Sequence, residues 1–289
     1  MTATRRIAAA AIAVGLATAA AAQTALNWSA DDGARIATLE KSGRRIAGTH
    51  MVVWHPPSLL PSDADRLLRR LDPAVAALRA KVGRRAWQVV PTGKITYYLS
   101  DDAFVSHASG RAAVFVPMAR VIDGRAPYLH EAMHELLASS AADPPSADGA
   151  PPVRRPLWLT EGLPDYVAQV VAGEVGMVET GPFASGGLAG ADAVCAERAR
   201  TADGATMLPF VGGPGRPDVL FTTDRARFAP TFYTCALSFT KFLAGRAGLD
   251  ALVELFGVPP SGTASRLDAL GGRPLDAHRA EWRAAIGLK

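Results

Sequence analysis

The segment that most constrains this chain is His130-Glu-Ala-Met-His134. Histidines four positions apart lie one helical turn from each other, so both imidazoles project from the same face of a helix. Two neutral ring nitrogens can then bind one zinc ion, and Glu131 lies at the edge of the same face. A carboxylate there can accept a proton from a water that zinc activates.

The residues around this segment predict a buried helix. Pro127 suits a first helical turn, and an apolar stripe follows at helical spacing. The stripe consists of Leu129, Met133, Leu136 and Leu137. A pattern of three fixed positions also arises by accident, and an accidental match would leave an amphipathic helix with two unrelated histidines.

A third ligand in the right place separates these two interpretations. Glu161 follows His134 by 27 positions, within Leu157-Trp-Leu-Thr-Glu-Gly-Leu-Pro-Asp-Tyr-Val167. Two histidines and one glutamate are an established ligand set for catalytic zinc, which leaves a fourth position to water. Asp165 lies one turn after Glu161, where it can accept the second N–H of a zinc-bound histidine.

Together, H-E-x-x-H and E-x-x-x-D resemble the gluzincin class of zinc metallopeptidases. The sequence around Glu161 is similar to that of small bacterial peptidase MA-like domains. The metzincin pattern does not fit, because Leu137 and Ser140 stand where a glycine and a third histidine are needed. The resemblance implies an α+β, zincin-like fold, one Zn2+ and a peptide or protein substrate.

The N-terminus reads as a targeting segment. Arg5 and Arg6 precede an apolar run that ends in Ala20-Ala-Ala22, which is typical of a cleaved export signal over residues 1–22. We expect a periplasmic or secreted protein without a membrane anchor after cleavage; the alternative is an uncleaved N-terminal anchor. Removing both arginines lowers the formal charge from +4 to +2. The remaining charges are scattered, so nucleic acid is not an expected partner, and we expect a monomer.

Cys195 and Cys235 are the two cysteines of the chain. In an exported protein an even pair predicts a disulfide, and the alternative is two buried thiols. The bridge would close a loop of about 40 residues and stabilise the fold by ~3–4 kcal/mol.

Two parts of one peptidase domain are expected, an α/β part over residues 23–125 and a helical part over residues 126–289 that begins with the metal helices. In the first part, residues 34–40 and 45–55 read as a hairpin, and a helix follows with a break or kink at Asp72-Pro73. The resemblance assigns the edge strand of the cleft to Ala113, Val114, Phe115, Val116 and Pro117. An unpaired edge can add an extended peptide as a further strand, although the same segment suits an interior strand.

In the second part, the Pro-rich stretch 138–156 is expected to be a connector or a lid, and Pro164 to mark a helix start. Residues 181–216 read as loop, and four helices are expected at 230–244, 249–256, 263–270 and 275–286. Tyr233, in a segment similar to the same peptidases, is the candidate donor of a hydrogen bond to the oxyanion. The alternative for Tyr233 is a packing role.

The sequence therefore predicts a zinc peptidase. His130, His134 and Glu161 are its ligands, and Glu131 is its general base. No acidic element that would anchor an N-terminal amine is evident, which favours an endopeptidase. The main rival is a peptidase-like envelope module that binds zinc or a peptide without turnover; a metal-buffering protein is disfavoured by the few, sulfur-poor ligands.

Overall fold

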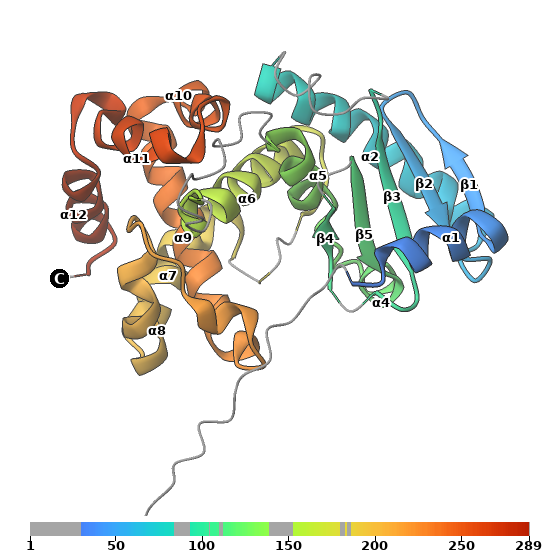
Figure 1. Ribbon diagram of the computed structural model, residues 1–289, viewed down its shortest axis with the longest axis horizontal. Helices are drawn as coiled ribbons and strands as arrows, with labels where there is room; N and C mark the ends of the chain where they lie inside the picture. Colours follow the sequence, from blue (N-terminus) through green and yellow to red (C-terminus); the bar gives the residue numbers. More distant parts are fainter. Residues whose placement is uncertain are drawn as a thin grey trace, which may run out of the picture.

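The computed structural model describes residues 30–83, 93–103, 105–109, 112–138, 153–179, 183 and 186–288. The expected export signal, residues 1–22, lies outside these ranges, as does most of the 138–156 connector. The described chain is α+β, with a mixed sheet at one side and a helical part at the other (Figure 1). No helix in the described ranges is long and apolar enough to cross a membrane.

The sheet has five strands in the order β1-β2-β3-β5-β4. β1 (Arg44–Ala47) and β2 (Met51–His55) form an antiparallel pair. β3 (Ile95–Ser100) and β5 (Ala113–Pro117) continue the sheet in parallel to β2. The two-residue β4 (His107–Ala108) pairs antiparallel with β5 and forms the outer edge.

Helices cover both faces of this sheet, because side chains alternate along each strand. α1 (Asp32–Ser42) packs through Leu39 against Tyr98 and Phe115 on one face. On the other face lie α2 (Pro61–Val82) and α5 (Tyr128–Leu137), in the main core. A short helix, α4 (Met118–Ile122), follows β5 directly.

One expectation for this part was wrong. Residues 34–40 are helical, because Arg35 and Leu39 bury one face of α1 at i,i+4 spacing. At Asp72-Pro73 the helix is not broken, since α2 continues through Pro73. The Asp72 carboxylate instead accepts the backbone N–H groups of residues 49, 50 and 51 at 3.0, 2.8 and 3.2 Å, which fixes the turn between β1 and β2.

The helical part begins with α6 and is built around α9. Its helices are α6 (Leu157–Glu174), α7 (Gly187–Ala199), α8 (Ala202–Met207), α9 (Arg225–Ala247), α10 (Leu249–Glu254), α11 (Pro260–Asp268) and α12 (Leu275–Ala285). The four predicted C-terminal helices are confirmed within a few residues. The prediction of loop over 181–216 was wrong for α7 and α8. Both are short helices that contain glycines, and both pack on α9.

Two features tie α9 to its neighbours. The predicted disulfide is present between Cys195 of α7 and Cys235 of α9, with Cα atoms 4.9 Å apart and both residues fully buried. Gly162 of α6 lies so close to α9 that an added Cβ would be 2.4 Å from Thr240 Oγ1 and 2.6 Å from Ala236 O. Glycine is therefore required there for α6 and α9 to approach.

Candidate metal site

Helix α5 presents His130 and His134 from the interior of the protein. Its apolar side, including Leu129 and Met133, lies in the main core as the stripe predicts. Glu179, which follows α6, caps the helix: its Oε1 accepts the backbone N–H groups of Leu129 and His130 at 3.1 and 3.2 Å. Burial, with nearby acidic groups, raises the pKa of Glu179 to about 8. A helix start is a favourable place for a carboxylate, because its N–H groups are otherwise unpaired.

Glu161 completes a cluster of three possible metal ligands. His130 Nε2 and His134 Nε2 lie 3.1 Å apart, and Glu161 Oε2 lies 3.7 and 3.6 Å from them. Helix α6 starts at Leu157, so Pro164 lies inside the helix and does not mark its beginning. Glu161 nevertheless points to the two histidines, and one donor atom from each residue lies within 4.8 Å of the others.

The chemistry of this cluster fits a divalent cation. Burial disfavours a charged imidazole, yet the Glu161 carboxylate outweighs this and raises the pKa of His134 to about 9. Burial alone would raise the pKa of Glu161, but His134 and His130 hold it well below its usual range. Two imidazole nitrogens and a carboxylate oxygen are donors that zinc and related metals accept.

Asp165 is buried beside the cluster. Its carboxylate interacts electrostatically with His130, and Oδ1 accepts a hydrogen bond from Gln169 Nε2 at 2.9 Å. Burial raises the pKa of Asp165, and the charge of His130 opposes this. His130 Nδ1 is buried without a hydrogen-bond partner in the described part of the chain. The bond expected from a ligand histidine to Asp165 therefore stays a prediction.

The three residues open into a cavity of about 370 Å³, which Glu131 also lines. The side chain of Glu131 is only 5% exposed, so its carboxylate faces the cavity and not bulk solvent. Phe183 and Phe221 add apolar surface to the lining, and His107 and Ala108 of β4 contribute a strand edge. The cavity therefore combines a possible metal site, a further carboxylate and an extended backbone segment.

Tyr233 lines the same cavity from α9. Its pKa is raised, first by burial and then by Glu161. Arg225 donates to its hydroxyl oxygen through Nη2 at 3.1 Å and to the Leu220 carbonyl through Nη1 at 3.1 Å. Because the tyrosine oxygen accepts from Arg225, its own proton remains available for donation to another acceptor.

The edge strand beside the cavity is β4 and not β5. Residues 113–117 form a strand with the expected bounds, but this strand pairs with β3 on one side and β4 on the other. The prediction that Ala113–Pro117 is the edge was therefore wrong, and the interior alternative is correct. β4 is too short to leave an alternating pattern in the sequence.

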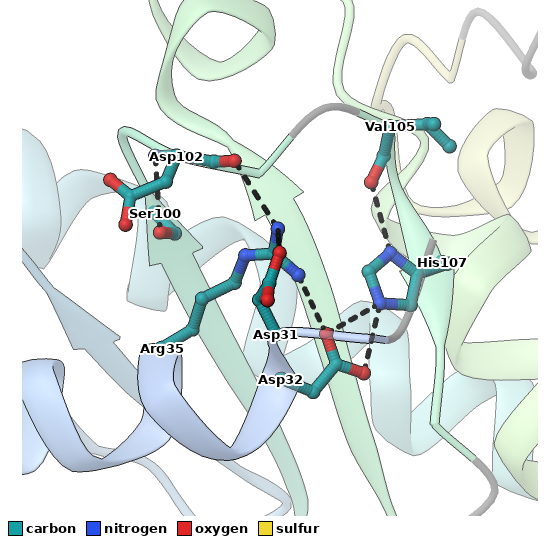
Figure 2. Close-up of polar contacts among 7 residues, drawn as sticks. All are labelled: Asp31, Asp32, Arg35, Ser100, Asp102, Val105 and His107. Carbon is teal, nitrogen blue, oxygen red and sulfur yellow. Dashed lines mark hydrogen bonds and ion pairs between the residues drawn. The ribbon is translucent and has the colours of Figure 1, made fainter. Parts of the chain in front are cut away.

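His107 fixes this edge to α1. Figure 2 shows its ring between Asp32 and the Val105 carbonyl. Nε2 lies 3.0 and 3.1 Å from the two Asp32 carboxylate oxygens, and Nδ1 lies 3.0 Å from Val105 O. The ring also stacks on Phe115, with centroids 5.0 Å apart. Asp32 is held in turn by Arg35 Nη1 at 3.0 Å.

A second buried carboxylate ties α5 to the sheet. Glu135 is fully buried, and its Oε2 accepts the backbone N–H of Ala112 at 2.6 Å. Ala112 has a positive φ of 59°, a conformation that costs a non-glycine residue free energy. The start of β5 is therefore positioned by α5.

Four residues around the site were missed by sequence reasoning. Glu135 and Glu179 accept backbone hydrogen bonds from other segments, and Arg225 donates to Tyr233. Arg120 of α4 lines the cavity. The only sequence signal among them is Glu135, which lies one turn after Glu131 in the same helix.

Comparison of the sequence with protein-family models gives no match, and comparison with curated proteins gives none either.

Proposed function

We propose that this chain is an exported, zinc-dependent peptidase with a zincin-like fold of the gluzincin type. The observation that carries this proposal is that Glu131 lines the same cavity as His130, His134 and Glu161. A site that only holds a metal has no use for a carboxylate at this place. The disulfide supports an oxidising compartment outside the cytoplasm.

His130, His134 and Glu161 would hold the ion. When bound, zinc would supply Lewis acidity toward a water and a substrate carbonyl. Glu131 takes a proton from the attacking water as the new C–O bond forms. It then gives that proton to the peptide nitrogen, and the C–N bond breaks as the amine leaves. Tyr233, whose oxygen accepts from Arg225, donates its hydroxyl proton in a hydrogen bond to the oxyanion. The outer edge of β4 would offer backbone groups to an extended substrate.

Glu131→Gln tests this assignment. The mature, zinc-equilibrated protein and the variant are incubated with a quenched-fluorophore peptide library, and bound zinc is measured in both. We expect equal zinc content and a rate lower by about 10²- to 10⁴-fold in the variant, the usual contribution of a general acid–base group. The matched control is Glu174→Gln, at a half-exposed position that pairs with Lys81 away from the cavity.

Full activity in Glu131→Gln would refute the role of this carboxylate. Zinc binding without cleavage by the wild-type protein would favour the rival, a peptidase-like module that binds without turnover. Cleavage by the wild type and by Glu174→Gln, but not by Glu131→Gln, would support the proposal. The cut sites would distinguish endopeptidase from exopeptidase action.

A further inference from the structure

Two arginine side chains line the cavity beside the candidate metal ligands. Arg120 comes from α4, which follows the sheet strand β5, and Arg225 comes from the start of α9. The cavity thus receives one cation from the α/β part and one from the helical part. Burial lowers the pKa of Arg120, and Glu131 opposes this. Arg125 and then Arg225 add smaller contributions that lower it further, so Arg120 lies near charges of both signs.

The two arginines differ in how they are held. Arg225 is oriented by its bonds to Tyr233 and the Leu220 carbonyl. No side-chain hydrogen bond or ion pair joins Arg120 to another residue in the described ranges. Its neighbour Arg125, by contrast, pairs with Asp123 at 2.5 Å. A guanidinium that lines a cavity carries five donors, and a ligand with suitable acceptors can bind them.

The charge balance of the cavity also favours an anion. Among the described lining residues, Arg120 and Arg225 offset Glu131 and Glu161 when the three lining histidines are neutral. A bound divalent cation then leaves the lining with a net charge of about +2, in a confined space where charges interact strongly. Phe183 and Phe221 in the same wall suit the carbon chain that would carry the anionic group.

We propose that Arg120, with Arg225 beside it, forms a carboxylate-binding subsite, so that the preferred substrates carry a carboxylate next to the cleaved bond. This inference rests on the proposed peptidase function for its substrate class. Arginine presents two parallel N–H groups to a carboxylate, which gives both affinity and orientation. The carboxylate comes either from an Asp or Glu side chain or from the C-terminus of a peptide, and both sources offer the same planar pair of oxygens.

The test measures binding without turnover. In a zinc-equilibrated Glu131→Gln background, calorimetry compares acetyl-Ala-Ala-Glu-Ala-Ala-amide with its Gln counterpart, and acetyl-Ala-Ala-Ala with its C-terminal amide. We expect the acid of at least one pair to bind about tenfold more tightly than its neutral counterpart, as charge-assisted hydrogen bonds are roughly twice as strong as neutral ones. The pair that shows the preference identifies the source of the carboxylate.

Adding Arg120→Met should bring that preference close to onefold, and Arg120→Lys should retain part of it, because the charge stays and the paired donors are lost. Arg125→Met is the matched control: it removes a nearby positive charge outside the cavity and should leave the preference unchanged. Equal binding of acid and neutral peptides, or a preference that survives Arg120→Met, would overturn the subsite. Because this binding measurement requires no hydrolysis, failure of the subsite and failure of the peptidase function can be distinguished. Failure of the peptidase function would appear as no cleavage by the wild type.

Discussion

Reduction of the Cys195–Cys235 disulfide tests how the helical part is stabilised. The bridge joins residues 40 positions apart on α7 and α9. In the chain-entropy account, opening a loop of this length costs about 4 kcal/mol, because the unfolded chain regains the freedom that the bridge removes. That is a large share of the roughly 5–15 kcal/mol by which domains are usually stable.

The assay is equilibrium urea unfolding at neutral pH, with and without a phosphine reductant. With an m-value of about 2–3 kcal/mol/M, we expect reduction to lower the midpoint by roughly 1–2 M. The Cys195→Ala/Cys235→Ala double variant is the control, and its midpoint should not respond to the reductant. A wild-type midpoint that moves by no more than that of the control would refute the argument, since the crosslink would then contribute nothing to the unfolding free energy.

Three further predictions concern the site and its supports. Zinc binding to the metal-free protein at pH 7 should release about one proton, because Glu161 raises the pKa of His134 to about 9. Calorimetry in buffers of different ionisation enthalpy measures the number of protons released. A binding heat that does not depend on the buffer would contradict this prediction. Ala112→Gly should change the unfolding free energy by less than about 1 kcal/mol, since glycine adopts the positive φ freely, whereas Ala74→Gly inside α2 should cost more than that. Asp72→Ala should lower the unfolding free energy, measured in urea, by about 2–4 kcal/mol. Asp72→Asn should lower it by less, because the amide oxygen still accepts hydrogen bonds from the backbone. Equal losses in the two variants would argue against a contribution from the three backbone bonds.

The ligand cluster and the disulfide could be predicted because their signals are local or countable. His130 and His134 share a helical face by spacing alone, and a single cysteine pair allows only one bridge. Glu161 was also expected from its surrounding residues, and the structure brings it to the two histidines although Pro164 lies inside its helix.

The errors arose where tertiary contacts outweigh local pattern. Residues 34–40 contain Ile36 and Thr38, which favour strands, but burial of Leu39 against Phe115 favours a helix. The glycines of α7 weaken a helix that gains its stability by packing on α9 and by the disulfide. Arg120 and Arg225 have no fixed spacing from the histidines, so only the folded chain brings them to the cavity.

The bond between Glu135 and the Ala112 N–H has a mechanical consequence. Glu131 and Glu135 lie one turn apart on α5. The helix that carries Glu131 into the cavity is therefore also bound to the start of β5, through Glu135. β5 holds β4 by backbone pairing, and His107 joins β4 to α1. These elements are expected to move as one rigid body, which keeps the spacing between Glu131 and the strand edge constant. Thermal widening of the cavity should then come from the opposite wall, where α9 carries Tyr233.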